Sequence, residues 1–231
     1  MTPDILDRLL AAQAAARPAV LVRHLADNTQ TLLVDGERVL GPDLPASLAT
    51  VVAGALRNDK STKLETPEGD WFVQVFNPPL RLVVVGAVHI AQALVPMAKL
   101  AGYAVTVVDP RRTFASDDRF PDVPLVHDWP DDALDALAPD ARTAVVTLTH
   151  DPKLDDPALI RALRSPAFYI AALGSKKTHG LRVQRLLEAG LTQADIDRIH
   201  GPAGLNLGAV SPAEIAISVM AQMTQVLRSP R

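Results

Sequence analysis

Small, polar and basic residues follow several apolar segments of this sequence. Gly86-Ala87-Val88-His89 comes directly after the apolar run 82–85, and Gly174-Ser175-Lys176-Lys177-Thr178-His179 follows the run 169–173. Backbone amides at the start of a helix, together with lysine side chains, bind anions such as phosphate groups. Two lysines at the positive end of a helix dipole are unfavourable unless an anion offsets them. The second loop is therefore expected to bind an anion.

The loop at Gly86 carries part of the glycine pattern of dinucleotide-binding sites. In that pattern the first glycine makes a tight turn, the second lets a pyrophosphate approach, and the third position packs a helix against the sheet. Gly86 and Ala91 fit the first and third positions, but Val88 occupies the second and is expected to crowd a pyrophosphate. The loop is therefore either an anion site or an ordinary turn between a strand and a helix.

Asp109 ends the next apolar run, 105–108, where dinucleotide-binding proteins place an acidic residue. Its carboxylate could accept hydrogen bonds from a ribose, and the neighbouring Arg111 and Arg112 suit a phosphate. The alternative is an Asp109-Pro110 turn that only closes a strand.

A hydroxyl, an imidazole and a carboxylate follow the run 144–148, at Thr149, His150 and Asp151. Polar residues after the strands of a parallel sheet face the ligand, although a turn that caps the next helix explains them equally well. His89, His150 and His179 are expected at one edge of the sheet. No carboxylate accompanies them at the spacing of metal ligands, so no metal site is predicted.

Four short apolar runs must position these loops. They are rich in β-branched residues and apolar on both faces, as strands buried inside a parallel sheet are. Helical segments are expected at 90–100, 133–137, 157–163 and 181–187. The sequence therefore predicts an α/β fold with a Rossmann-like, doubly wound parallel sheet.

A last helix is predicted after Ser211-Pro212-Ala213-Glu214, which has the pattern of a capping box with proline at the first helical position. Ile215, Val219 and Met223 then recur at helical spacing and form one apolar stripe. We expect this stripe to be buried in the core or in a dimer interface.

Residues 1–77 have a different pattern and are expected to form a small α+β module. Thr2 is expected to cap a first helix, and Asp35-Gly36 to make the turn of a β-hairpin. A second helix is expected at 44–56. The prolines Pro78 and Pro79 separate this module from the Rossmann-like domain at 81–231.

The composition limits the classes of function. The chain has 231 residues, 48% of them apolar, and a formal net charge of −3, so no basic surface for nucleic acid is expected. The absence of cysteine excludes disulfides, zinc-thiolate sites and iron–sulfur clusters. No signal peptide is recognised, and polar residues interrupt the longest apolar stretch. We therefore expect a cytoplasmic protein without a membrane span.

Six motifs occur in order over residues 81–223. They are Gly86-Ala87-Val88-His89, Val107-Val108-Asp109-Pro110-Arg111, Arg119-Phe120-Pro121, Thr149-His150-Asp151-Pro152-Lys153, Gly174-Ser175-Lys176-Lys177-Thr178-His179, and the segment 199–209 followed by Pro212-Ala213-Glu214-Ile215-Ala216. This series resembles the XdhC/CoxI family of molybdenum-cofactor maturation and insertion chaperones for xanthine- and carbon-monoxide-dehydrogenase-type hydroxylases.

The resemblance implies a dimeric chaperone that binds molybdopterin, or its nucleotide-extended form, and meets a molybdoenzyme apoprotein of the xanthine dehydrogenase type. The phosphate of this pterin ligand would lie on the loops at Gly86 and Gly174, near Lys176, Lys177 and Arg111. His150 and Asp151 would contact the rest of the ligand. We expect a binding protein rather than an enzyme.

This chain departs from the family in two respects. Longer members have a larger N-terminal domain with cysteine-containing segments, which this chain lacks, and many members have a glycine at the position of Val88. Two other readings remain. One is an NAD(P)-dependent oxidoreductase with Asp109 on the ribose and His150 as acid or base. The other is a purely structural partner subunit.

Overall fold

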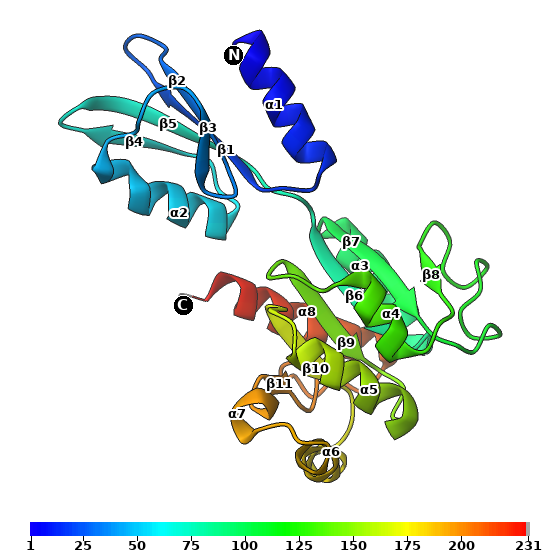
Figure 1. The fold of residues 1–231 in the computed structure, drawn as a ribbon. Helices are drawn as coiled ribbons and strands as arrows, with labels where there is room; N and C mark the ends of the chain where they lie inside the picture. Colours follow the sequence, from blue (N-terminus) through cyan, green and yellow to red (C-terminus); the bar gives the residue numbers. More distant parts are fainter. Residues whose placement is uncertain (230–231) are drawn as a thin grey trace. The chain divides into compact units, whose positions relative to one another are not determined.

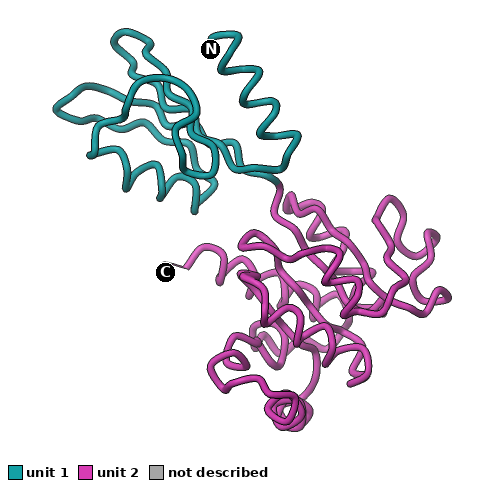
Figure 2. Tube along the Cα trace, in the orientation of Figure 1, with its two compact units in different colours: residues 1–78 teal, residues 79–231 magenta. Residues whose placement is uncertain are grey.

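A computed structural model describes residues 1–229 of the chain. The chain divides into two compact units, Met1–Pro78 and Pro79–Arg231 (Figure 2). None of the helices in the described part is long and apolar enough to cross a membrane.

The first unit is a five-stranded antiparallel sheet with a helix on each face (Figure 1). Its strands are β1 (Ala19–His24), β2 (Gln30–Val34), β3 (Glu37–Leu40), β4 (Thr62–Thr66) and β5 (Gly69–Phe76), in the order β3-β2-β1-β5-β4. Helix α1 (Pro3–Ala14) packs on the face that carries Ala19. The turn η1 (Ala46–Leu48) and helix α2 (Ala49–Asn58) pack on the face that carries Val20.

Two local features of this unit were predicted from the sequence. Asp35 and Gly36 both have a positive φ, +52° and +82°, as a two-residue hairpin turn requires. Thr2 does precede α1, but its side chain makes no capping hydrogen bond, so that part of the prediction is wrong. Pro3 at the first helical position has no N–H to be capped, which reduces the need for such a bond.

The second unit contains the predicted parallel sheet, which has six strands where four were expected, because two strands of only two residues each were not predicted. Its strands are β6 (Leu80–Val85), β7 (Tyr103–Val108), β8 (Leu125–Val126), β9 (Thr143–Thr147), β10 (Tyr169–Ala172) and β11 (Ile199–His200). Their order across the sheet is β11-β10-β9-β6-β7-β8, and every neighbouring pair is parallel. The chain thus winds outward from β6 in both directions. This is the doubly wound order, in which ligands bind beyond the carboxyl ends of the two central strands.

Helices cover both faces of this sheet. Helices α3 (His89–Leu100) and α8 (Pro212–Arg228) pack on the face that carries Leu82 and Val84. Helices α4 (Pro130–Leu137), α5 (Pro152–Leu163), α6 (Lys176–Glu188) and the short α7 (Gln193–Ile196) pack on the opposite face. The central strands are therefore buried on both sides, which explains why they are apolar throughout.

Helices α5 and α6 begin five residues earlier than the sequence predicted. The side chains of Asp151 and Ser175 cap them by accepting hydrogen bonds from the backbone N–H groups of Lys153 and Thr178. Both helices therefore start directly at the carboxyl edge of the sheet. In α8 the predicted capping box is present, and Val219 and Met223 are fully buried in the core, whereas Ile215 is half-buried.

Candidate functional site

The loops that follow β6, β7, β9 and β10 lie at the carboxyl ends of the parallel strands. We call these four loops together the carboxyl edge. Gly86, after β6, has a φ of +109°, and a Cβ atom placed on it would lie 2.6 Å from Cγ2 of Thr149. A glycine is therefore needed for the loop after β6 to approach the loop after β9. Replacing Gly86 by any residue with a Cβ atom would also strain the backbone at this φ.

Asp109, at the end of β7, is fully buried and holds the loop after β6. Its Oδ2 accepts a hydrogen bond from the backbone N–H of Ala87 (2.9 Å) and one from Nη2 of Arg111 (2.8 Å). Its Oδ1 accepts bonds from the backbone N–H (3.0 Å) and Nε (2.9 Å) of Arg111. Burial raises the pKa of this carboxyl, but these hydrogen bonds and the guanidinium charge outweigh it, so the pKa lies below its usual value.

Arg111 is half-buried and its guanidinium lies over an aromatic ring. Its guanidinium carbon is 4.3 Å from the centroid of Phe114, which is itself exposed. The neighbouring carboxylate of Asp109 raises the pKa of Arg111, and the more distant charges of Asp151 and Asp155 act in the same direction. The loops after β7 and β9 are therefore close enough to interact electrostatically.

Val88 and His89 form the junction between the loop after β6 and helix α3. Val88 is the N-cap residue and its half-buried side chain packs against the apolar core below, while His89 is exposed. Arg119, from the Arg119-Phe120-Pro121 motif, braces the junction by donating hydrogen bonds to the carbonyl of Ala87 (2.8 Å) and to the side chain of Gln92 (2.9 Å). No role at the site was predicted for Arg119 from the sequence.

The loop after β9 is organised by Asp155, a buried residue of α5 that the sequence analysis did not single out. Its carboxylate accepts hydrogen bonds from the hydroxyl of Thr149 (2.7 Å) and from the backbone N–H of His150 (3.1 Å). His150 is thereby held with a φ of +62° and its ring is exposed to solvent. Asp151 is exposed and caps α5. The interpretation as a helix-capping turn is therefore confirmed, and contact of these residues with a ligand stays a prediction.

Arg182 of α6 lies beneath the loop after β10 and is almost completely buried. Its Nη2 donates a hydrogen bond to the carbonyl of Leu173 (2.9 Å) and lies 3.7 Å from Oδ2 of Asp155. Its Nε and Nη1 have no hydrogen-bond partner within residues 1–229. Gly174 lies directly above the guanidinium, since a Cβ atom on it would be 3.8 Å from Nη2. A buried guanidinium with unsatisfied donors favours an anion nearby.

Lys176 and Lys177 are the first two residues of α6, and both are exposed. Ser175 caps the helix, so the hydroxyl that could have contacted a ligand already accepts a bond from Thr178 N–H (3.1 Å). Among the described residues no ion pair involves either lysine. Two uncompensated cations therefore occupy the positive end of the helix, as the sequence predicted.

His179 is partly buried and lies on the backbone of the segment after β11. A Cβ atom on Gly201 would be only 2.1 Å from the Nδ1 of His179, so the ring occupies the space that a side chain at 201 would fill. That Nδ1 has no partner in the described chain. Burial lowers the pKa of His179, and the charge of Arg182 lowers it further. We therefore expect a neutral imidazole.

The histidines of the carboxyl edge do not form a metal site in the described part of the chain, where no group of three or more His, Asp or Glu side chains is arranged around a common point. His89 and His150 are exposed, while the ring of His179 packs on Gly201.

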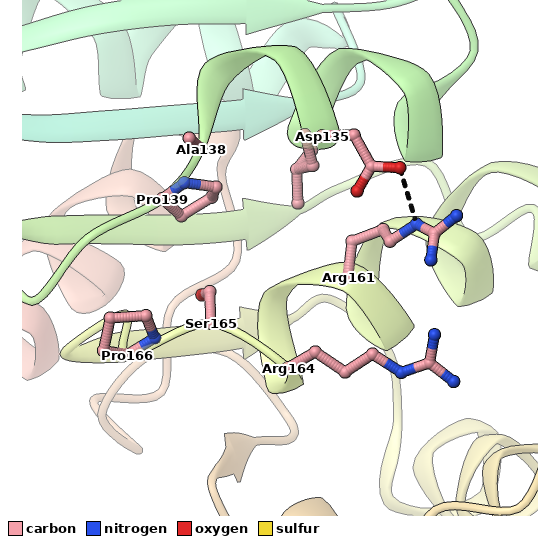
Figure 3. Close-up of a pocket in the computed structure, with 8 residues that line it drawn as sticks. Asp135, Ala138, Pro139, Arg161, Arg164, Ser165 and Pro166 are labelled. Atoms are coloured by element: carbon pink, nitrogen blue, oxygen red, sulfur yellow. Dashed lines mark ion pairs between the residues drawn. The ribbon is translucent and has the colours of Figure 1, made fainter.

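A shallow pocket of about 320 Å³ lies elsewhere, at the opposite edge of the sheet (Figure 3). Arg161, Arg164 and Ser165 line it from the end of α5, and Asp135 and Pro139 line it from the end of α4 and the segment after it. Asp135 and Arg161 form an ion pair of 3.2 Å across it. Ligands of doubly wound sheets bind at the carboxyl edge, so we do not assign a ligand to this pocket.

Residues 82–223 match the family model described as the XdhC Rossmann domain. The chain belongs to the XdhC family. It is 33% identical over 160 residues to "Uncharacterized protein YqeB" and 32% identical over 151 residues to "Molybdenum cofactor insertion chaperone PaoD", both from Escherichia coli K12. These matches cover 67% and 65% of this XdhC chain, but only 29% and 41% of the two relatives. The chain therefore matches less than half the length of either relative.

A solved structure, described as a xanthine dehydrogenase from Bacillus halodurans, is similar to this XdhC chain. The TM-score is 0.73 with 26% sequence identity, and the match covers 99% of this chain and 65% of the other. The likeness thus includes the N-terminal unit, which lies outside the residues that match the family model.

Proposed function

We propose that this chain binds the molybdenum cofactor and delivers it to the apoprotein of a xanthine dehydrogenase-type molybdoenzyme. The observation that carries the proposal is the concentration of anion-binding groups at the carboxyl edge of an XdhC Rossmann domain. One relative is named a molybdenum cofactor insertion chaperone, and a similar structure is described as a xanthine dehydrogenase. The cofactor, a pterin that carries a phosphate group, is cargo in this proposal.

The phosphate is proposed to lie near the start of α6. Lys176 and Lys177 supply uncompensated positive charge there, and the same helix carries Arg182, whose buried Nε and Nη1 have no partner among the described residues. These groups suit a phosphate, because each charge-assisted hydrogen bond to an oxyanion is stronger than a neutral one. Arg111 is proposed to contact another part of the ligand from the loop after β7, which lies beyond β9 and β6 in the sheet.

The remainder of the ligand is proposed to lie over the loops after β6 and β9. Gly86 lets the loop after β6 pack closely against the loop after β9, and the exposed His150 and Asp151 offer polar contacts to the pterin. His89 and His179 flank the same loops at the starts of α3 and α6. The chain is proposed to act by binding and release, without catalysing a reaction.

The alternative of an oxidoreductase that uses NAD is less well supported. The acidic residue that such enzymes use to bind ribose corresponds to Asp109, whose carboxylate oxygens are both bound within the protein. We further propose that the chain works as a homodimer, as the family resemblance implies, and that it works in the cytoplasm. Light scattering on the purified protein tests the dimer.

The proposed function is tested by co-purification under anaerobic conditions from cells that make the molybdenum cofactor. We expect molybdenum and a pterin to be bound in similar amounts, and the loaded chain to activate a xanthine dehydrogenase apoprotein. The variant Lys176→Ala/Lys177→Ala should retain much less pterin, whereas Arg164→Ala, at the opposite edge, should retain as much as wild type. Co-purification of NAD(P) with hydride-transfer activity would overturn the proposal.

A further inference from the structure

We propose that the surface around Trp129 docks a basic segment of the apoprotein that receives the cargo. The inference rests on the proposed function, because it assigns a place on this chain to the partner of that function. The surface consists of Asp128, Trp129, Asp131 and Asp132, which follow the edge strand β8 of the parallel sheet (Figure 1). We call these four residues the acidic surface.

Negative charge is concentrated in the segment that contains this surface. Residues 117–140 include eight aspartates and one arginine, whereas the remainder of the chain has more basic than acidic residues. That arginine, Arg119, donates its hydrogen bonds to uncharged groups. Asp135 and Asp140 form ion pairs with arginines, but the other six aspartates pair with no cation among residues 1–229. The segment therefore projects a negative electrostatic field.

Trp129 is exposed at a position where the helix would favour another residue. It is the N-cap residue of α4, its side chain is 53% exposed, and it makes no capping hydrogen bond. Serine, threonine, aspartate or asparagine at an N-cap would stabilise the helix. An exposed indole is better suited to binding, because it offers a large apolar surface and attracts cations over its ring. Trp129 therefore suits a contact with a partner better than it suits the free chain.

Carboxylates flank this indole on both sides in the sequence. Asp128 precedes it, and Asp132 is the third residue of α4, whose side chain lies beside the N-cap position. Asp131 and Asp132 also favour the start of the helix through its dipole, but Asp128 lies before the helix and has no such role. No three acidic or histidine side chains of the described chain surround a common point, so a metal ion is not the expected occupant. Separate carboxylates beside an indole suit the arginine or lysine side chains of a protein.

The acidic surface is joined to the loops that are proposed to carry the cargo. The carbonyl of Val126 accepts a hydrogen bond from the backbone N–H of Asp109 (3.0 Å), and Nδ1 of His127 lies 3.4 Å from the carbonyl oxygen of Asp109. Asp109 in turn binds the N–H of Ala87 in the loop after β6. Only β7 separates β8 from β6, which puts these two strands about 10 Å apart. A partner held at the acidic surface would therefore lie next to the pterin.

The chemistry of the cargo selects the charge of this partner. An apoprotein that receives a phosphate-bearing pterin needs cationic donors at its empty site. Basic groups around the entrance of that site would be complementary to the acidic surface, and such complementarity orients the encounter and speeds association. A second copy of this chain is a poorer occupant, because a symmetric contact at this surface would place aspartates against aspartates.

The experiment measures binding of a xanthine dehydrogenase apoprotein, purified from cells that cannot make the cofactor, to this chain on a biosensor. Trp129→Ser should weaken binding by about tenfold or more, mainly through faster dissociation. It should also raise the melting temperature by about 2 to 4 °C, because serine is a favoured N-cap residue. Asp128→Asn/Asp132→Asn should slow association, and added salt should slow wild-type association more than that of this variant. Both variants should retain molybdenum and pterin as wild type does.

Matched controls remove the same kinds of group elsewhere. Leu100→Ser replaces an apolar side chain that is 92% exposed at the end of α3. Asp4→Asn/Asp7→Asn removes two exposed acids from α1, one of them in the first turn of that helix. Both controls should bind the apoprotein as wild type does.

The inference is overturned, and the proposed function stands, if Trp129→Ser and the aspartate variant bind the apoprotein as tightly as a wild type that still delivers the cofactor. It is also overturned if wild type does not bind the apoprotein, or if Trp129→Ser converts a dimer of this chain into a monomer. If wild type binds the apoprotein through Trp129 but retains neither molybdenum nor pterin, the proposed function fails and the docking surface is supported.

Discussion

Asp155 of α5 and Arg182 of α6 form an ion pair that is closed off from solvent. Oδ2 and Nη2 are 3.7 Å apart, and the two side chains are 1% and 2% exposed. Since Asp155 also accepts hydrogen bonds from Thr149 and His150, the ion pair connects the loop after β9 to α6, the helix that follows the loop after β10. Burial raises the pKa of Asp155 and lowers the pKa of Arg182, because desolvation disfavours both charged forms. The ion pair therefore holds the loops of the carboxyl edge in place. Burying its two charges lowers the stability of the fold.

Replacing Arg182 by methionine should be strongly destabilising. The change leaves the Asp155 carboxylate buried without a cation, which typically costs about 3 to 5 kcal/mol. Adding Asp155→Asn should recover part of this loss, since it removes the uncompensated charge. Urea unfolding measures the free energy of unfolding of the single and the double variant. As a control, Arg185→Met breaks the more exposed pair with Asp156 and should cost about 1 kcal/mol or less. Equal losses for the two arginines would contradict the argument.

The raised pKa of Asp155 predicts how stability depends on pH. A folded-state pKa above the unfolded value of 3.8 means that the folded protein holds this proton more tightly. The free energy of unfolding of wild type, relative to Asp155→Asn, should therefore fall as the pH rises from 3.8 through the raised pKa. Unfolding of both proteins at several pH values measures the difference. A difference that grows with pH would show that the carboxyl is instead stabilised as an anion.

The sequence was sufficient to predict the parallel sheet and the loops at its edge. Runs such as 82–85 and 144–148 are β-branched and apolar on both faces, which only strands covered on both sides require. Glycines, lysines and hydroxyl groups after those runs then had to lie at one edge, because parallel strands end together. The sheet and the loops at its edge can therefore be predicted from the local pattern of apolar residues and from the parallel topology alone.

The partners inside the carboxyl edge could not be predicted in the same way. Asp109 looked available for a ribose, since its bonds to Ala87 and Arg111 depend on side-chain directions that spacing does not fix. A signal for the buried pair was present, however. Asp155 precedes Leu159 and Arg182 precedes Leu186 by one helical turn, which places both charges on the buried faces of their helices.

Two glycines near His179 should respond to alanine in opposite ways. Gly201→Ala places a methyl group 2.1 Å from the His179 ring, and such overpacking should cost about 1 to 3 kcal/mol while moving the imidazole. Gly180→Ala lies in helix α6 with no atom within 4 Å, and should stabilise by about 0.5 to 1 kcal/mol. Thermal melts and the NMR signals of His179 measure both effects. If Gly201→Ala left the melting temperature unchanged, the His179 ring would be free to move away from the added methyl group.

Replacing Val88 by glycine should not by itself create an NAD⁺ site. Val88 packs against the core, and Asp109 remains saturated by Ala87 and Arg111 whatever residue stands at 88. Combining Val88→Gly with Arg111→Ala removes both obstacles and should raise NAD⁺ affinity more than either change alone. Calorimetry measures the affinities. Micromolar NAD⁺ binding by Val88→Gly alone would show that crowding at the second glycine position was the only obstacle.

The lysines at the start of α6 should contribute to binding and not to stability. Because cations at the positive end of a helix are unfavourable by several tenths of a kcal/mol each, Lys176→Ala/Lys177→Ala should leave the melting temperature unchanged or slightly raised. Its affinity for neopterin monophosphate should fall by about tenfold or more. Added salt should weaken wild-type binding more than binding by the variant, since screening acts on charges that the variant lacks.

The control for the lysine pair is Lys60→Ala/Arg164→Ala, which removes the same charge from exposed positions outside the carboxyl edge. It should bind the monophosphate as wild type does, at both low and high ionic strength. If the lysine variant instead kept its affinity and melted at a lower temperature, Lys176 and Lys177 would be stabilising the helix by pairing with neighbouring acids. The phosphate would then have to bind another cation of the carboxyl edge, such as Arg111, whose side chain is 37% exposed.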